Sequence, residues 1–161
     1  MPAHFRFAAA VFCMLAASAV TAQVPQYGPN VNQEQARKAI AGALAEARKI
    51  NVPMAVTVVD TAGQLVAFER MDNTQTGSIA VSQDKAVSAA MFRRPTKAFQ
   101  DVVAGGGAGL RILTLRGASA VEGGVPLTLD GKIIGAIGVS GGSAEQDGEV
   151  AKGGSAALAA K

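Results

Sequence analysis

The sequence predicts an α+β domain with a central antiparallel sheet of about five strands, built from two hairpins and flanked by helices. Two pairs of apolar runs are each separated by a short turn sequence, which is the pattern of a β-hairpin. Three longer segments carry apolar residues at helical spacing. A length of 161 residues leaves room for one domain.

Residues 1–22 have the composition of a secretory signal peptide. Arg6 precedes an apolar run from Phe7 to Ala17, and small residues follow up to Ala22. The apolar run is shorter than the roughly 20 residues that a membrane span needs. We therefore expect cleavage after Ala22, a flexible mature N-terminus at residues 23–30, and an exported protein, periplasmic or extracellular, with no membrane span.

Cleavage would remove His4 and Cys13, which are the only histidine and the only cysteine of the chain. A mature protein without these residues has no thiol nucleophile, no Ser-His triad and no zinc site built on His or Cys. We predict no metal site. The formal charge of +3 falls by one with Arg6, the basic residues are scattered and aromatic residues make up 4% of the chain. This composition argues against nucleic-acid binding.

The first structural elements are a helix and a hairpin. Residues 32–50 have apolar residues on one stripe, and Asn32 with Gln35 forms a predicted capping pair. The runs 54–60 and 64–72 are strand-like, and Thr61-Ala62-Gly63 joins them as a turn.

The next helix is predicted over residues 78–92. Arg93-Arg94-Pro95 ends it, because the residue before proline avoids helical backbone angles. Lys85 is expected to be solvated. The predicted buried face consists of Ile79, Ala86, Val87, Ala90 and Met91.

Residues 96–122 carry the weakest pattern. A short helix is predicted over residues 97–103, a flexible connection over 104–109, and residues 110–115 fit either a helix or a strand. In contrast, residues 125–140 predict a hairpin with Asp130-Gly131 at the turn. Ser143 and Gln146 then predict the capped start of a final helix that runs to about Ala160.

The stretch "GAIGVSGGSAEQD" at residues 135–147 is rich in glycine. It lacks the spacing of a dinucleotide-binding fingerprint and the lysine of a P-loop. Two interpretations stay open. The backbone N–H groups at the start of the final helix could bind an anion or carboxylate, or the glycines serve the packing of a helix on the strand and the turn alone. Gly141 is expected to adopt a positive φ.

Four segments together resemble the GlcG/HbpS family of haem-binding or haem-degrading domains. They are "VTVVDTAGQLVAFERMD", "KAVSAAMFRRPT", "GGVPLTLDGKIIGAIGVSGGSAEQD" and the alanine-rich final helix. The likeness runs from about Val31 to Ala160 and predicts a single family-like domain at residues 31–161. The resemblance implies an α+β fold with an antiparallel sheet, a haem ligand and a symmetric homo-oligomer.

Haem iron is usually bound by His, Cys, Met or Tyr. The mature chain offers Tyr27, Met54, Met71 and Met91, and the methionines are expected to fill the core. Any haem is therefore expected to bind without histidine ligation, through its ring faces and propionates or through a weak oxygen ligand.

The candidate residues for a small-molecule ligand come from the segments that carry the resemblance. An arginine could hold a propionate or simply complement the helix dipole. Asp147 could orient a ligand, act as a general base or stabilise the start of the final helix. The glycine pairs could let a flat ligand approach the backbone. No catalytic residue is assigned, and the full candidate set is Arg93, Arg94, Thr96, Gly123, Gly124, Gly138, Ser140, Gly141, Gly142 and Asp147.

The leading functional prediction is an exported binding protein for haem or a related anionic small molecule, acting in sequestration, sensing or uptake. One alternative is an enzyme of the same family that acts on haem or on a small organic acid. The other is an oligomeric accessory protein without a ligand. A closed homo-oligomer is expected because the final helix has more apolar surface than one sheet face covers.

Overall fold

The computed structural model describes residues 24–159, so the predicted signal peptide lies outside the described residues. The predicted α+β class is confirmed, with four strands in the order β2-β1-β4-β3 and every neighbouring pair antiparallel. Four strands form rather than about five, because the two hairpins supply four, and residues 97–104 and 107–114 are helical. The elements are α1 (Gln33–Lys49), β1 (Ala55–Val59), β2 (Leu65–Arg70), α2 (Ser78–Phe92), α3 (Lys97–Ala104), the 3-10 helix η1 (Gly107–Thr114), β3 (Gly124–Leu129), β4 (Lys132–Ser140) and α4 (Ala144–Ala159).

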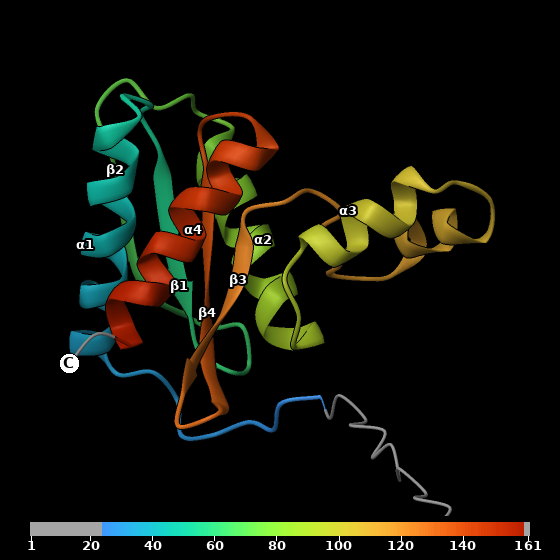
Figure 1. Cartoon of the computed structure of the whole chain (residues 1–161), viewed down its shortest axis with the longest axis horizontal. Helices are drawn as coiled ribbons and strands as arrows, with labels where there is room; N and C mark the ends of the chain where they lie inside the picture. Colours follow the sequence, from blue (N-terminus) through green and yellow to red (C-terminus); the bar gives the residue numbers. More distant parts are fainter. Residues whose placement is uncertain (1–23, 160–161) are drawn as a thin grey trace, which may run out of the picture.

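Helices cover both faces of the sheet (Figure 1). On one face, α1 and α4 pack over a core that includes Val56, Val58 and Ile137. On the other face, α2 packs through alanines against Val59 and Ala136. The second interface is built from small side chains, which lets the α2 backbone lie close to the strands.

Both predicted turns are present. Asp130 and Gly131 have φ angles of 49° and 74°, as the positive-φ turn of a two-residue hairpin requires. In the first hairpin, the Asp60 carboxylate accepts hydrogen bonds of 2.9 Å from the backbone N–H groups of Ala62 and Gln64.

The helix ends also follow the predictions. Asn32 and Gln35 form a reciprocal capping box at α1, and Ser143 and Gln146 form another at α4. Helix α2 ends where Arg93 adopts a left-handed conformation with a φ of 53°.

The predicted buried face of α2 is partly wrong. Ser82 and Lys85 are buried, whereas Met91 is 51% exposed. The apolar residues alone predict the wrong face of α2, because the buried polar groups of this helix have hydrogen-bond partners on other elements. Thr57 Oγ1 of β1, for example, lies 2.8 Å from Ser82 Oγ.

The segment preceding α1 is held against β4, although residues 23–30 are predicted to be flexible. Tyr27 forms a parallel bridge with Ile133, and Gly28 donates a hydrogen bond of 2.7 Å to the Ile133 carbonyl. The Tyr27 hydroxyl donates to the carbonyl of Ala90 at 2.9 Å, which ties this segment to the end of α2.

Helix α3, η1 and the residues up to Val121 form a projecting segment, residues 97–121, that extends to one side of the sheet (Figure 1). Within residues 24–159, no helix combines the length and the apolar character that crossing a bilayer would require.

The apolar face of α4 is covered by α1. Ala151 and Leu158 are buried in the main core, and a methyl group on Gly42 of α1 would overlap the Ala157 side chain. Ala151 and Leu158 therefore add no free apolar surface for oligomerisation, whereas Ala156 of the same helix is exposed.

Candidate functional site

A buried ion pair connects α2 to the start of α4. Lys85 Nζ lies 2.7 Å from Asp147 Oδ2, and the two side chains are 1% and 4% exposed. Lys85 also donates to the Val139 carbonyl at 3.1 Å, and Asp147 Oδ1 accepts from the Gly142 N–H at 2.9 Å. Burial raises the pKa of Asp147 above 3.8, against the lowering effect of Lys85 and Gly142. The prediction that Lys85 is solvated is wrong, because its charge is paired and hydrogen-bonded inside the fold.

Two glycines let the chain that enters β3 lie directly against this ion pair. Gly123 has a φ of 129°, and a methyl group there would sit 2.8 Å from Lys85 Nζ. A methyl group on Gly124 would overlap the Lys85 carbonyl oxygen and lie 2.6 Å from Thr96 Cγ2. Glycine is required here by close approach of the chain to itself.

Thr96 fastens the start of α3 to β3. The Gly124 N–H donates to Thr96 Oγ1 at 2.9 Å, and the Thr96 N–H donates to the Gly124 carbonyl at 3.0 Å. Both residues are buried. This reciprocal pair fixes where α3 lies relative to the sheet and to α4.

A pocket of about 310 Å³ opens between α3, β3 and α4, and we call it the Glu122 pocket. Its volume is at the lower end of the range for small-molecule sites. Apolar groups form most of its surface, and four charged side chains add polar atoms. It is lined by Pro95, Lys97, Ala98, Asp101, Glu122, Gly124, Val125, Gly148 and Lys152.

Glu122 is the buried charge of this pocket. Its side chain is 7% exposed, and its carboxylate oxygens lie 3.6 Å from Lys152 Nζ and 4.0 Å from Lys97 Nζ. The Glu122 backbone is anchored by a hydrogen bond of 2.8 Å to Gln100 Oε1. A methyl group on Gly148 of α4 would overlap the Glu122 carboxylate. The absence of a side chain at Gly148 therefore leaves space for the Glu122 side chain.

The two lysines lie at the rim of the Glu122 pocket and are about half exposed. Lys97 pairs with Asp101 at 2.8 Å and Lys152 with Glu149 at 2.7 Å. These hydrogen bonds raise the pKa of both lysines above 10.5, so both are protonated at neutral pH. Exposed pairs of this kind are weak, so both lysines can turn toward an anionic ligand.

The structure brings part of the predicted candidate set to this place. Gly124 lines the Glu122 pocket, and Thr96, Gly123 and Asp147 pack behind it. Gly142 donates to Asp147 from the turn before α4.

The remaining glycine-rich residues face other parts of the chain. A methyl group on Gly138 would overlap the α2 backbone, and one on Gly141 would overlap the Pro53 carbonyl oxygen. Ser140 Oγ lies 3.0 Å from Ser78 Oγ, inside the α2 interface. Gly141 does not have the expected positive φ, and glycine is required there by the close approach of Pro53 and Met54.

The two candidate arginines lie on aromatic rings. The Arg93 guanidinium is 5.4 Å from the centre of the Tyr27 ring, and that of Arg94 is 5.5 Å from the centre of the Phe99 ring. Neither arginine lines the Glu122 pocket.

The side chains that usually bind haem iron also lie elsewhere. Met54 is fully buried in the core, as predicted, whereas Met91 is half exposed and the Tyr27 hydroxyl is hydrogen-bonded to α2. None of the three lines the Glu122 pocket, and residues 24–159 contain no cluster of three acidic, His or Cys residues that could hold a metal ion. The pocket therefore offers apolar walls and cationic side chains at its rim, but its lining includes no side chain that usually binds haem iron.

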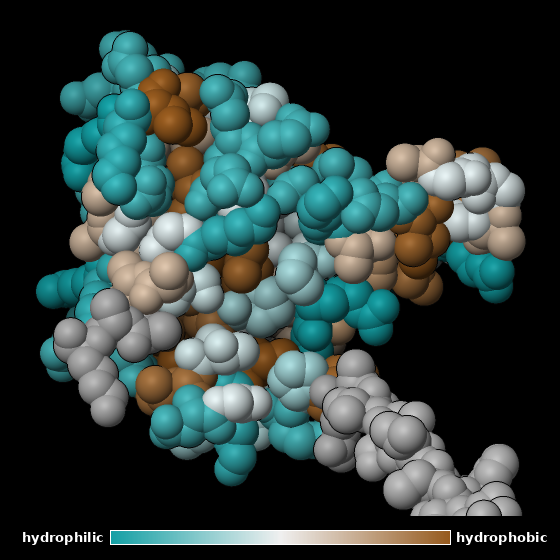
Figure 2. All heavy atoms as spheres, in the orientation of Figure 1, coloured by the Kyte–Doolittle hydropathy of each residue, from teal (hydrophilic) through white to brown (hydrophobic). Residues whose placement is uncertain are grey.

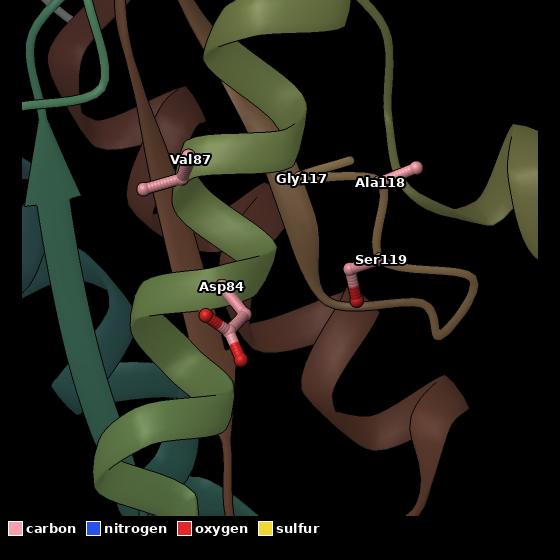
Figure 3. Close-up of a pocket in the computed structure, with 5 residues that line it drawn as sticks. All are labelled: Asp84, Val87, Gly117, Ala118 and Ser119. Atoms are coloured by element: carbon pink, nitrogen blue, oxygen red, sulfur yellow. The ribbon is translucent and has the colours of Figure 1, made fainter. Parts of the chain in front are cut away.

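A second pocket of about 380 Å³ lies between α2 and the residues that precede β3 (Figure 3). The Asp84 carboxylate and the Ser119 hydroxyl are on its opposite walls. The lining includes no cationic side chain, so it suits an anionic ligand less well than the Glu122 pocket does.

Sequence reasoning missed Lys85, Glu122, Lys97 and Lys152. A signal for Lys85 does exist, since Ser78, Ser82, Lys85 and Ala89 follow helical spacing and are all buried. A lysine on a face of small residues is a mark of a buried, paired charge. No comparable pattern marks Glu122, which stands in an irregular segment.

Comparison with known proteins agrees with this fold and places haem among the ligands of similar proteins. A family model described as "Haem degrading protein HbpS-like" matches residues 31–156. Protein GlcG of Escherichia coli K12 is 40% identical over 110 residues, which are 68% of this chain and 81% of GlcG. A solved PduOC:haem complex has a TM-score of 0.71 and 31% identity, and the match covers 80% of this chain and 94% of PduOC. A double mutant of Streptomyces reticuli HbpS has a TM-score of 0.73 and 26% identity, with 96% and 97% of the two chains covered.

Proposed function

The chain belongs to the HbpS-like family, and on this premise we propose that it is an exported protein that binds haem or a related anionic small molecule in the Glu122 pocket. Its role would be sequestration, sensing or uptake. Binding rather than turnover is the leading proposal, because the lining of the pocket contains no hydroxyl, thiol or imidazole side chain, and Lys97 and Asp101 in that lining are paired with each other.

The observation that carries the proposal is the combination of an apolar pocket with two lysines at its rim. The apolar walls can cover the face of a flat ring, and the ammonium groups of Lys97 and Lys152 can pair with carboxylates that extend into solvent. The haem complex of PduOC supports a haem-like ligand. A whole tetrapyrrole would extend beyond the pocket, with its carboxylates toward the lysines.

A haemin titration followed at the Soret band tests the proposal. Lys152→Ala should weaken binding, because it removes one carboxylate partner. Lys49→Ala is a matched control, since Lys49 also pairs at 2.7 Å with a glutamate three residues before it, on α1 and outside the pocket. Equal affinities for the two variants would contradict binding at the Glu122 pocket, and no spectral change with haemin would contradict haem binding altogether.

The description of the matching family model as haem-degrading keeps an enzymatic alternative open. The same titration in the presence of a reductant separates the two functions. A shifted band that stays constant supports binding, whereas loss of the band with release of iron supports degradation.

Export itself is tested at the N-terminus of the mature protein. The signal-peptide pattern predicts that the exported form starts at Gln23. Detection of Met1 on the protein from a cytosolic fraction would refute cleavage and export.

The proposal includes a homo-oligomer that is assembled through the projecting segment. Figure 2 shows hydrophobic side chains gathered on this segment, and such a patch is uncommon on a monomer. Light scattering should give a multiple of the mature mass, and Leu113→Asp should lower it, while a monomeric wild-type mass would refute the oligomer. The exposed apolar residues are Val102 (47%), Leu110 (49%), Leu113 (64%), Leu115 (42%) and Val121 (46%).

A further inference from the structure

The 3-10 helix η1 is poorly covered by the rest of the described chain. None of its residues is buried, and it packs chiefly against α3, in which Phe99 is the one buried residue. Long 3-10 helices are uncommon, and short helices are marginally stable without tertiary contacts. The eight residues of η1 therefore depend on a further surface that covers the exposed side chains of Leu110 and Leu113.

The outer face of α2 has a matching character. On the other face of the sheet α1 and α4 pack on each other, whereas α2 packs chiefly on strands β1, β3 and β4. The side of α2 that points away from these strands carries an outer stripe at helical spacing, formed by Ala80, Asp84, Val87 and Met91. Val87 and the Asp84 carboxylate also line the second pocket, of about 380 Å³ (Figure 3).

The charges of the two surfaces are complementary. Arg111 of η1 and Arg116 beyond it pair with none of the carboxylates that the structure describes, and Arg111 Nε donates only to the Ala108 carbonyl at 2.8 Å. Asp84 has neither an ion pair nor a hydrogen bond with any residue in the range 24–159. A cationic η1 and an anionic outer stripe therefore attract each other.

The second pocket suits a guanidinium group. The Asp84 carboxylate and the Ser119 hydroxyl are on its opposite walls (Figure 3), and its lining includes no cationic side chain. The N–H groups of a planar guanidinium can donate to both, and the aliphatic part of an arginine can pack on Val87. Within one chain the projecting segment that carries Arg111 extends to one side of the sheet (Figure 1), so the arginine for this pocket has to come from another molecule.

We infer that η1 of one copy docks on the outer stripe of α2 in a second copy, with its Arg111 on the second copy's Asp84 and its leucines on Val87 and Met91. A second copy is the partner because both complementary surfaces belong to this chain. Reciprocal docking of this kind gives a closed two-fold dimer. The inference rests on the proposed function, since it names the surface that the projecting segment contacts in the proposed homo-oligomer.

Reversal of the two charges tests the contact, with the dissociation constant of the mature protein measured by analytical ultracentrifugation. Asp84→Arg and Arg111→Asp should each raise that constant by about tenfold or more. The double variant Asp84→Arg/Arg111→Asp restores opposite charges and should return the constant toward the wild-type value. Glu34→Arg is the matched control, because Glu34 is also an exposed acid but lies at the start of α1, on the opposite face of the sheet.

The exchanged residues are exposed, so the variants should fold as the wild type does. Single reversals that leave the dissociation constant unchanged, or a double variant no tighter than the single ones, would overturn the inference. If Leu113→Asp still dissociates the oligomer in that case, the proposed homo-oligomer stands and uses another surface. A monomeric wild-type protein would overturn both, whereas the haemin titration judges ligand binding separately.

Discussion

Gly138 is the position where one methyl group should have the largest effect on stability. It lies in β4 between Thr57 of β1 and Gly124 of β3, directly beneath α2. An alanine methyl group there would overlap the Ser82 carbonyl oxygen and lie 2.5 Å from the Ala86 nitrogen and 2.9 Å from the Ala86 Cβ. Two of these atoms belong to the helix backbone, so no side-chain rotation relieves the overlap, and α2 would have to move away from the sheet.

Overpacking of a core typically costs about 1–3 kcal/mol, and more when the backbone must shift. For Gly138→Ala we expect a loss of about 3 kcal/mol or more in the free energy of unfolding, because α2 also carries Lys85 and its partner contacts. The variant should have a clearly lower urea midpoint and melting temperature than the wild type.

Gly77→Ala is the matched control for this experiment. Gly77 has a φ of −60° and no atom within 4 Å of an added methyl group, so the same substitution should be neutral or stabilise by up to about 1 kcal/mol. A Gly138→Ala variant within about 0.5 kcal/mol of the wild type, the usual range for surface changes, would show that α2 does not pack on this glycine.

Four further variants test the cluster behind the Glu122 pocket. Lys85→Met should lower the free energy of unfolding by about 3–5 kcal/mol, because it leaves the Asp147 charge buried and unpaired. The double variant Lys85→Met/Asp147→Leu should recover part of that loss in urea unfolding. A double variant less stable than the single one would argue against a buried charge as the cause. Because burial raises the pKa of Asp147 above 3.8, the folded protein holds that proton more tightly than the unfolded chain, so this group makes stability fall as pH rises through the interval above 3.8. Asp147→Asn should flatten that slope in the interval above pH 3.8, and an unchanged slope would assign the titration to another group. Thr96→Val should cost about 1–3 kcal/mol, since the buried Gly124 N–H loses its acceptor, and a melting temperature equal to the wild type would refute that role.

The parts of the fold that the sequence predicts correctly depend on neighbours within a few residues. The capping boxes at Asn32 and Ser143 and the turn at Asp130-Gly131 each involve groups no more than three residues apart, so their residue types are enough to identify them. The projecting segment has no such local signal. Its glycines and apolar residues fit several conformations, and the segment forms helices that depend on contacts with the sheet, such as the Thr96–Gly124 pair.

The candidate site was predicted only in part, because its charges meet across long sequence separations. Lys85 and Asp147 are 62 residues apart, and Glu122, in the irregular segment before β3, meets Lys97 of α3 and Lys152 of α4. A glycine in the sequence does not reveal whether a ligand or another segment approaches it, and most of these glycines turn out to face the chain itself. Gly124 alone among the candidate glycines combines both roles, since one side receives α2 and the other lines the Glu122 pocket. Packing of α2 therefore fixes the back wall of the pocket, and a loss of that packing at Gly138 should weaken ligand binding even though Gly138 does not line the pocket.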